Sequence, residues 1–441
     1  MTYPKIVAIG FAAIILIGSL LLSLPISTKL NSVSYIDALF TATSATCITG
    51  LVPFDTFSTW SVFGQIVILC LIQIGGLGFI TVLGFVAKTL GKGKKLGLKQ
   101  KMLLKESVGS LDLGNVKELT RDVVTFTFCC ELVGAVLLST RLIPLAGWRR
   151  GIYMAVFTSV SAFCNAGFDL MGMVSPSSSL TTLNDDPVVM ITVSLLIVFG
   201  GLGFIVWQNI RRQKFKFKRF SPYTKLVLTA TAILIFGGMA MFFVLEQDYT
   251  LRDMPLWQQL LNALFCSITP RTAGFNSVDI MSMSPTSRMI TILLMFIGGS
   301  SASTAGGVKV NTVAILFLCM LADMRNKSDV NAFGKRVPTD AVKRAMAVVL
   351  VNLSNILVAT VIICGVQGSL GITDVIFECT SAMGTVGITT GITPQLTTVS
   401  QLVIIVLMYI GRLTSLIFAL SFVVSKPRTT TQKPKGSFIV G

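Results

Sequence analysis

Long apolar runs dominate this chain of 441 residues and restrict what it can fold into. A segment of about 20 predominantly apolar residues is long enough to span the hydrocarbon core of a bilayer. Runs of this kind recur along the whole sequence, at residues 6–24, 123–138, 188–207, 226–245, 289–297, 346–364 and 402–424. They are continuous rather than alternating, which argues against a β-barrel. The sequence therefore predicts an all-α, polytopic membrane protein.

The composition disfavours a soluble enzyme. Hydrophobic residues make up 53% of the chain and charged residues 12%, and the mean hydropathy is +0.79. The sequence has no histidine, which removes the usual general base and metal ligand. Its nine cysteines lack paired spacing, so we expect packed thiols rather than disulfides or a metal site. We expect no enzymatic activity, no cofactor bound by this chain, and a first apolar run that is a retained helix rather than a signal peptide.

Basic residues are concentrated in a few stretches, and this predicts the topology. The net charge is +17, yet residues 25–60, 139–187, 246–288 and 366–400 together carry more acidic than basic side chains. By the positive-inside rule, the basic stretches face the cytoplasm. We expect a multi-pass protein of the cell (inner or plasma) membrane with both termini in the cytoplasm. The basic stretches could contact anionic membrane lipids or dock a cytoplasmic partner. They are KTLGKGKKLGLKQK, RRQKFKFKRF, RNKSDVNAFGKR and KPRTTTQKPK.

These basic stretches divide the chain into four units of about 100 residues each. Each unit begins and ends in the cytoplasm, so it must cross the membrane an even number of times. We predict an outward helix, a middle segment and an inward helix in each. The predicted divisions are repeat 1 (1–95), repeat 2 with its preceding basic loop (96–215), repeat 3 (216–325), repeat 4 (326–425) and a cytoplasmic tail (426–441).

The middle segments of the four units share a motif. They read ALFTATSATCITGL, AVFTSVSAFCNAGF, ALFCSITPRTAGF and VIFECTSAMGTVGI. Each opens with an apolar helical stretch and passes through Ser or Thr into a glycine followed by an apolar residue. The third copy is one residue shorter and contains Pro270-Arg271. Each segment is too short and too polar at its end to be a further span, so we predict a short helix that enters the membrane and turns back.

A second glycine motif follows each copy. It reads IGGLGF, FGGLGF, IGGSSA and IGRLTS, with its first glycine at Gly75, Gly200, Gly298 and Gly411. For any single glycine, close packing of membrane helices is an equally good explanation. Two motifs that recur together in four units instead indicate a repeated architecture.

The repeat predicts four helix–pore-hairpin–helix units in a pseudo-fourfold arrangement around one pore. This gives about eight transmembrane helices and four re-entrant pore helices. Irregular backbone at membrane depth is tolerated where it lines a water-filled cavity or is buried in protein. Four such hairpins around one axis would form a ring of backbone carbonyls, which can replace the hydration shell of a monovalent cation.

These stretches resemble the membrane subunit of bacterial Ktr-type potassium uptake systems, in the Trk/Ktr/HKT superfamily of cation transporters. The resemblance rests on SATCITGL, SAFCNAGF, TPRTAGFNSVD, SAMGTVGITTG, QIGGLGF, GGSSASTAGGVK and YIGR. It implies K⁺ as the transported ion, with Na⁺ possible, and a carbonyl filter. Members with serine at the first filter glycine tend to select sodium, so Gly50 favours potassium. The implied filter residues, which would bind the K⁺ ion, are Ile48, Thr49, Gly50, Asn165, Ala166, Gly167, Thr272, Ala273, Gly274, Thr385, Val386 and Gly387.

The resemblance also implies a gate below the filter. GGSSASTAGGVK would interrupt a helix of the third unit at residues 298–309 and form a flexible intramembrane loop. A pore-side arginine at position 412 would raise a barrier to cations or pair with this loop. A break without a gating role is the alternative, and Lys309 could instead snorkel to the cytoplasm. The implied gate residues are Gly298, Gly299, Ser300, Ser301, Ser303, Thr304, Gly306, Gly307, Lys309 and Arg412.

The family further implies partners. We expect a homodimer seated on a cytosolic ring of nucleotide-binding regulatory subunits, with ATP/ADP or a dinucleotide bound to that ring. This chain itself has no Walker motif and no dinucleotide-binding fingerprint, and we expect it to contact membrane lipids but no nucleic acid. A sodium-coupled potassium symporter, or a less selective monovalent cation transporter, is the alternative function. A membrane enzyme or scaffold is a further alternative, disfavoured by the absence of histidine.

Two carboxylates lie within apolar segments. Glu131, in FCCELVG, could be a paired structural charge or part of a coupling path. Glu378, on the fourth middle segment, is expected to stabilise the filter from behind rather than bind the ion.

Overall fold

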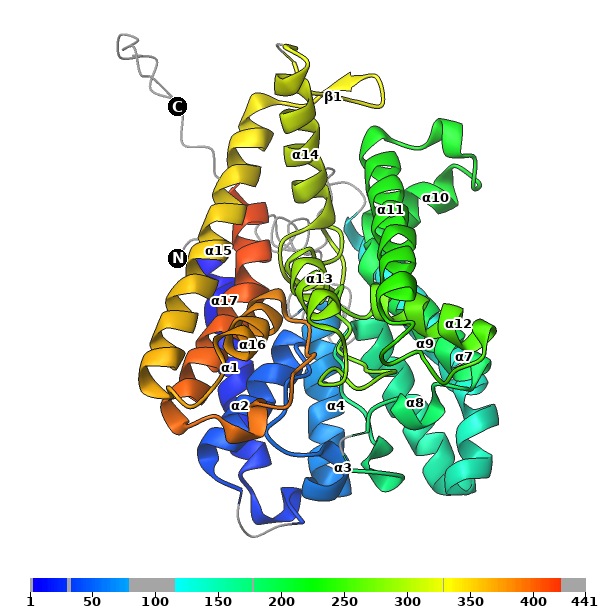
Figure 1. The fold of residues 1–441 in the computed structure, drawn as a ribbon, viewed down its shortest axis with the longest axis vertical. Coiled ribbons are helices and arrows are strands. Elements are labelled where there is room, and N and C mark those ends of the chain that lie inside the picture. Colours follow the sequence, from blue (N-terminus) through cyan, green and yellow to red (C-terminus); the bar gives the residue numbers. More distant parts are fainter. Residues whose placement is uncertain (1–2, 30–32, 79–115, 177, 328, 422–441) are drawn as a thin grey trace.

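The structure is a computed structural model that describes residues 3–29, 33–78, 116–176, 178–327 and 329–421 (Figure 1). The first basic stretch, the end of the predicted repeat 1 and the tail 426–441 lie outside these residues. The described chain is predominantly helical, and its one sheet is the short hairpin of β1 (Asn331–Ala332) and β2 (Lys335–Arg336). The prediction of an all-α chain is confirmed.

Three kinds of helix recur along the chain. The long helices that open the four predicted units are α1 (Tyr3–Leu22), α7 (Val116–Ala146), α11 (Pro222–Leu245) and α15 (Thr339–Val366). The short middle helices are α2 (Tyr35–Cys47), α8 (Trp148–Cys164), α12 (Leu256–Ile268) and α16 (Ile372–Gly384). The closing helices are α4 (Val62–Leu77), α9 (Pro187–Leu202) with α10 (Phe204–Arg212), α13 (Pro285–Phe296) with α14 (Val310–Met324), and α17 (Thr398–Ser421).

These helices pack in a closed cycle. Each long helix packs on the short helix that follows it, in the pairs α1·α2, α7·α8, α11·α12 and α15·α16. Each closing helix then packs on the short helix of another unit, in the pairs α4·α8, α9·α12, α13·α16 and α17·α2. The last pair joins the end of the chain to its beginning, so the contacts between the units close into a cycle.

Several of the described helices have the length and composition of a membrane span. Three meet both requirements, and the bent pair α9 and α10 makes up to four. Shorter apolar helices of 10–17 residues accompany them, at Val7–Leu22, Val62–Leu77, Pro285–Phe296, Val310–Met324 and Thr398–Leu413. These helices agree with a polytopic membrane protein, and the predicted division into repeats stays a prediction.

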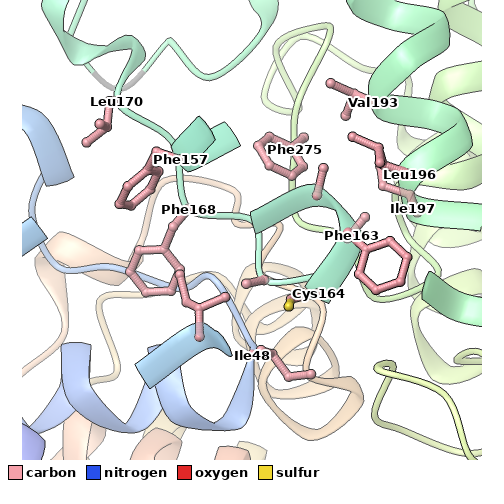
Figure 2. Packing of buried hydrophobic residues seen from close by; sticks show 14 of the residues in the cluster. Ile48, Phe157, Phe163, Cys164, Phe168, Leu170, Val193, Leu196, Ile197 and Phe275 are labelled. Atoms are coloured by element: carbon pink, nitrogen blue, oxygen red, sulfur yellow. The ribbon is translucent and has the colours of Figure 1, made fainter. Parts of the chain in front are cut away.

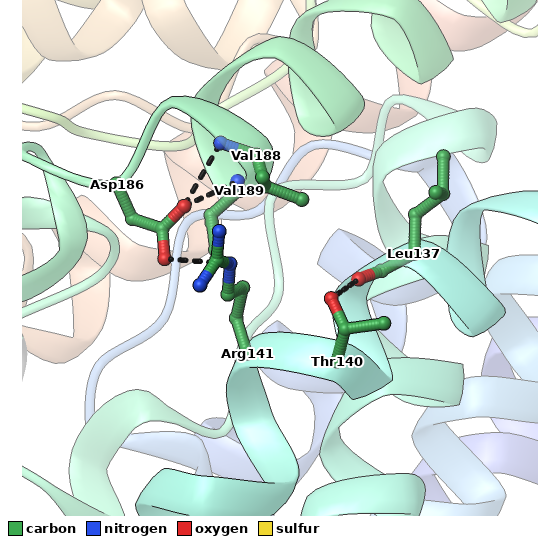
Figure 3. A network of polar contacts seen from close by, with 6 residues as sticks. All are labelled: Leu137, Thr140, Arg141, Asp186, Val188 and Val189. Atoms are coloured by element: carbon green, nitrogen blue, oxygen red, sulfur yellow. Dashed lines mark hydrogen bonds and ion pairs between the residues drawn. The ribbon is translucent and has the colours of Figure 1, made fainter.

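Polar caps set where several helices begin. Asp186 caps α9, because its Oδ1 accepts from the backbone N–H of Val188 at 2.8 Å and of Val189 at 3.3 Å (Figure 3). Its Oδ2 lies 3.3 Å from Nε of Arg141 on α7. Pro187 occupies the first helical position, where its missing N–H costs nothing. The cap therefore fixes the start of α9 and ties it to α7.

One apolar run is not a single straight helix. Residues 188–207 were predicted as one span, but α9 ends at Leu202 and α10 continues at an angle of 92°. Gly203, with φ 85° and ψ 144°, is the residue at the bend. A residue with a Cβ pays for such a positive φ, whereas glycine does not. Gly78, after α4, has nearly the same conformation, with φ 80° and ψ 129°.

The short helices are held by a buried apolar cluster. Phe157 and Phe163 of α8 and Phe168 after it belong to one buried cluster with Ile48 of the first unit and Phe275 of the third (Figure 2). All five side chains are essentially inaccessible to solvent. Burial of such large side chains contributes about 1.5–3 kcal/mol each, so this cluster fixes the turns that follow the helices.

Smaller elements complete the connections. They are η1 (Pro25–Ser27), α3 (Thr56–Thr59), η2 (Met171–Met173), η3 (Thr181–Leu183), η4 (Phe217–Arg219) and η5 (Thr393–Gln395).

Candidate functional site

Each short helix ends in a turn with the same two unusual backbone positions. The first is a non-glycine residue with positive φ: Ile48 at 54°, Asn165 at 58°, Thr272 at 74° and Thr385 at 50°. The second, two residues later, is a glycine with positive φ: Gly50 at 91°, Gly167 at 71°, Gly274 at 81° and Gly387 at 92°. Left-handed backbone is unfavourable for non-glycine residues, so the surrounding packing must hold these turns in place.

The amide groups of the turns point back to the short helices. The N–H before each glycine donates to a carbonyl of the same helix end. The pairs are Thr49 to Ser44 (2.8 Å), Ala166 to Ser161 (2.8 Å), Ala273 to Thr269 (2.9 Å) and Val386 to Ser381 (2.8 Å). The glycine N–H adds a bond to a serine hydroxyl in two turns, from Gly50 to Ser44 Oγ at 3.0 Å and from Gly387 to Ser381 Oγ at 3.1 Å. These backbone N–H groups of the turns are therefore already hydrogen-bonded to the ends of the short helices.

The four glycines, Gly50, Gly167, Gly274 and Gly387, form a ring, hereafter the glycine ring. A Cβ built on Gly50 would lie 2.5 Å from the carbonyl oxygen of Ala166, on Gly167 2.9 Å from that of Ala273, and on Gly274 2.6 Å from that of Val386. The position of Gly387 faces the carbonyl oxygen of Thr49 and closes the cycle. Each carbonyl therefore lies against the glycine of the adjacent turn, where a side chain would collide with backbone.

The second glycine motif packs directly beneath three of these turns. Gly75, Gly200 and Gly411 lie against the carbonyl oxygens of Thr46, Phe163 and Met383. Each of these carbonyls precedes its ring glycine by four residues. Absence of a side chain lets the closing helix approach the end of a short helix at this point.

The third unit departs from this pattern at residues 298–309, hereafter the loop 298–309. Here α13 ends at Phe296 and α14 begins at Val310, so the closing helix is interrupted. Gly298 N donates to Val308 O at 2.8 Å, and Val310 N donates to Gly299 O at 2.9 Å. These bonds close the base of the loop.

Residues of the loop 298–309 donate hydrogen bonds to the backbone carbonyls at the C-terminal end of α9. The last carbonyls of a helix lack intrahelical partners. Gly200 O accepts from Thr304 N at 3.3 Å, Gly201 O accepts from Ser300 N at 2.9 Å, and Leu202 O accepts from Ser300 Oγ. The bend at Gly203 and the loop of the next unit are thus parts of one hydrogen-bonded structure.

The loop also contacts the fourth turn. Gly306 lies against the hydroxyl of Thr385, and Gly307 lies beside the carbonyl of Gly384. Lys309 does not extend away from the loop. Its Nζ donates to Ala305 O at 2.6 Å and to Gly306 O at 3.2 Å, and its side chain is buried.

Arg412 joins the loop to the first unit. Its Nη1 donates to the carbonyl of Thr304 at 2.6 Å and its Nη2 to the carbonyl of Gly75 at 2.5 Å. The guanidinium therefore bridges α17, the loop and the glycine pair at the end of α4. Its side chain is buried.

The polar side chain of Asn165, two residues before Gly167, links two turns. In the amide orientation that satisfies both ends, Asn165 donates to the carbonyls of Ala162 at 3.1 Å and Ile197 at 3.2 Å. Its oxygen accepts from Thr272 Oγ1 at 3.1 Å. Asn165 thus holds the second turn to the third.

The two carboxylates of the apolar segments lie behind these turns. Glu131 accepts from Gln73 Nε2 at 3.0 and 3.2 Å and lies 3.9 Å from Cys164 Sγ. Glu378 accepts from the hydroxyl of Thr393, beyond the fourth turn. Both carboxylates are buried and hydrogen-bonded to neutral side chains.

Some residues of the site were not singled out from the sequence. Gly203 and the serines Ser44 and Ser381 are the main ones. Gly203 is the last residue of the string GGLG, which occurs in both the first and the second unit. Ser44 and Ser381 lie at the same distance before a ring glycine. Comparison of the repeats could therefore have identified all three residues from the sequence.

An all-helical membrane architecture around a ring of backbone carbonyls defines the chain as a candidate ion transporter. A family model described as "Cation transport protein" matches residues 6–433, and the chain belongs to this family. This confirms the family expected from the sequence. It also confirms that the chain is a transporter rather than an enzyme.

Curated relatives cover nearly the full length. The "Potassium/sodium uptake protein NtpJ" of Enterococcus hirae is 40% identical, covering 99% of this chain and 97% of the relative. The "Ktr system potassium uptake protein B" of Bacillus subtilis is also 40% identical, covering 100% and 97%. The crystal structure of the potassium transporter TrkH from Vibrio parahaemolyticus matches with a TM-score of 0.73 at 17% identity, covering 96% of this chain and 84% of that one. This last match concerns the fold.

Proposed function

We propose that this chain is the ion-translocating subunit of a potassium uptake system in the cell membrane, with both termini in the cytoplasm. The observation that carries the proposal is the glycine ring, in which four carbonyl oxygens and four glycines alternate around one centre. Relatives that share 40% of its residues are named as potassium or potassium/sodium uptake proteins.

The ring would act as the selectivity filter of one pore per chain, with one strand from each of four pseudo-fourfold repeats. The turn amides bond to the short helices, so the carbonyls of the filter residues are the groups left to replace water around K⁺. The short helices would be re-entrant pore helices that direct their negative ends toward the cation.

The loop 298–309 and Arg412 would form the gate. The loop contacts the end of α9, the fourth turn and Arg412 at once. Its hydrogen bonds run to groups in the second and fourth units, so one rearrangement can change all of them. A buried guanidinium in the path of a cation adds an electrostatic barrier that a displaced loop would remove.

Control would come from outside the chain. We propose a homodimer on a cytosolic nucleotide-binding ring that responds to ATP/ADP or a dinucleotide. Support comes from the relatives named as components of a Ktr system. The alternative is sodium-coupled or less selective transport, which the name of the Enterococcus hirae relative favours.

Flux measurements in liposomes test the proposal. We expect K⁺ uptake by the purified chain, higher selectivity for K⁺ than for Na⁺, and regulation on addition of the cytosolic partner. Sodium that is taken up in fixed ratio with K⁺ would favour the symporter. Absence of monovalent cation flux with and without the partner would overturn the proposal.

A further inference from the structure

A strongly basic, aromatic segment connects α9 to α11. It covers residues 204–221, which include α10 and η4, and is hereafter called the elbow. The elbow contains no acidic residue. Its basic side chains are all exposed, and no ion pair joins them to an acid among the residues that the structure describes. They are Arg211, Arg212, Lys214, Lys216, Lys218 and Arg219.

Two phenylalanines alternate with these cations. Phe215 is 78% exposed and Phe217 is 49% exposed. Lys214 and Phe215 have φ values of 48° and 60°, a conformation that is sparsely populated for such residues. The backbone is therefore held so that a large apolar ring projects outward beside lysines. Water is a poor solvent for this arrangement, whereas the boundary between headgroups and acyl chains suits both groups.

The elbow connects α9 to α11, and both the bent pair α9 and α10 and the helix α11 have the composition of membrane spans. The 92° bend turns α10 roughly perpendicular to α9, so α10 would run along the membrane surface if α9 spans it. The next helix, α11, has the length and composition of a span and begins at Pro222. Figure 1 shows α10 beside the end of α11 that is remote from α12.

The elbow is joined to the loop 298–309 on its inner side. Phe204 N donates to Ala302 O at 2.8 Å, and Tyr223 Oη, just beyond the elbow, donates to Ser301 O at 3.3 Å. Gly203, at the bend, packs against Ser300 and Ala302. Val206 and Ile210 of α10 pack in a buried cluster with Val310, the first residue of α14. A displacement of the elbow must therefore disturb the loop at both ends.

We propose that the elbow binds the headgroups of anionic phospholipids and that this binding holds the loop 298–309 in its docked position. The phosphates pair with the exposed lysines and arginines, while Phe215 and Phe217 enter the acyl boundary. This deepens the proposed function, because it names a ligand for the gate region and rests on that function for its effect on flux.

Lipid binding is tested directly on the purified protein. Native mass spectrometry compares retention of phosphatidylglycerol with that of phosphatidylcholine. The elbow variant is Lys214→Gln/Lys216→Gln/Lys218→Gln. We expect its preference for the anionic lipid to fall by on the order of 100-fold, since each basic residue near an anionic surface contributes about fivefold. The matched control is Lys327→Gln/Lys335→Gln/Lys343→Gln. These lysines are also exposed, but make no hydrogen bond to the loop within the described chain.

Coupling to the loop is tested by hydrogen exchange in nanodiscs. With phosphatidylglycerol present, the amides of Ser300 and Thr304 should exchange more slowly than in phosphatidylcholine alone. The elbow variant should lose this protection and the control should keep it. Phe215→Ala/Phe217→Ala should weaken lipid binding without a change in charge. Potassium flux without the partner should be lower in the anionic membrane for the wild type, and unaffected by lipid for the elbow variant.

Two outcomes would overturn the proposal. One is an elbow variant with the same lipid preference as the control. The other is an elbow variant that keeps its lipid preference but no longer binds the cytosolic ring, which would make the elbow a protein-docking surface. Loss of all cation flux from the wild type would count against the proposed function instead, because lipid retention and amide exchange are measured without transport.

Discussion

Arg412 donates a hydrogen bond of 2.6 Å to the carbonyl oxygen of Thr304, which joins the last helix to the loop 298–309. The same guanidinium donates to Gly75 at the end of α4. Arginine can bridge two carbonyls in this way because its donors form a rigid fork. The contact places a positive charge beneath the glycine ring and attaches it to the loop 298–309, the proposed gate.

Replacement of Arg412 by glutamine should open the pathway. The variant loses both the charge and the bridge, so we expect K⁺ flux without the cytosolic partner to rise by about tenfold, equivalent to a barrier lowered by about 1.4 kcal/mol. Arg412→Lys should raise flux less, because it keeps the charge and loses the bridge. Arg121→Gln, at an exposed arginine, is the control. Flux in liposomes that is unchanged in Arg412→Gln would remove this residue from the gate.

Gly50→Ser tests the glycine ring. A Cβ at this position meets the carbonyl of Ala166 at 2.5 Å, and φ is +91°, so the neighbouring carbonyl must move. We expect the preference for K⁺ over Na⁺ to fall by about tenfold in competition assays, equivalent to about 1.4 kcal/mol. Gly237→Ser is the matched control, because a Cβ at Gly237 meets nothing within 4 Å. Equal ion competition in both variants would contradict the assignment of the filter.

Three equivalent serines give an internal comparison. Ser44 and Ser381 accept from the amides of Gly50 and Gly387, whereas Ser161 Oγ, at the same position of the second turn, has no hydrogen-bond partner in the described structure. Ser44→Ala and Ser381→Ala leave a buried N–H unsatisfied and should each lower the free energy of unfolding by about 1–3 kcal/mol. Ser161→Ala should be close to neutral. Thermal unfolding in detergent measures the difference, and equal effects in all three variants would refute it.

The repeated motifs in the sequence indicated the residues of the four turns, but not the bend at Gly203 or the hydrogen bonds that join the loop 298–309 to α9. Hydropathy and the recurrence of two motifs were enough for the helical class, because both follow from residue types at regular spacing. The family was expected from the resemblance of several stretches to Ktr-type membrane subunits. The bend at Gly203 was missed, because apolar residues continue through 188–207 and hydropathy does not report direction. The bonds from Ser300 and Thr304 to the end of α9 were also out of reach, since they join separate units through backbone groups that every residue has.

Lys309 illustrates the same limit. A lysine at the end of an apolar stretch is equally consistent with snorkelling to water and with an inward hydrogen bond. The structure has the second arrangement, with Nζ on the carbonyls of Ala305 and Gly306. The choice depends on loop carbonyls that become available only when the helix is interrupted.

The capping hydrogen bonds from Asp186 to the start of α9 should stabilise the protein more than the ion pair between Asp186 and Arg141 does (Figure 3). Asp186→Ala removes two hydrogen bonds to the helix start and should lower the free energy of unfolding by about 1–2 kcal/mol. Arg141→Ala removes only an ion pair whose arginine side chain is 49% exposed, so we expect a loss of about 0.2–1 kcal/mol. Melting temperatures in detergent should therefore fall in the order wild type, Arg141→Ala, Asp186→Ala. The reverse order would show that the ion pair dominates.

Asp169 should make stability depend on pH. It lies between α8 and α9, outside the spanning helices, and its Oδ1 accepts from Met171 N at 2.9 Å. The pKa of its carboxyl group is raised to about 6. Burial is the largest cause and the nearby Asp55 acts in the same direction, while hydrogen bonds from Met171 and Ser179 oppose the shift. An unfolded aspartate has a pKa of about 3.9. The folded protein therefore binds this proton more tightly than the unfolded chain does.

The sign of the effect follows from that difference. As pH rises from about 4 to about 6, the unfolded state releases the proton first, so the free energy of unfolding falls, and above pH 6 it levels off. Asp169→Asn cannot titrate, so its melting temperature relative to the wild type should rise across this window. Asp279→Asn is the matched control, because Asp279 makes the same turn contact, to Met281 N, at an exposed position. A difference between wild type and Asp169→Asn that stays constant from pH 4 to pH 7 would show that the Asp169 carboxyl group does not titrate in this window.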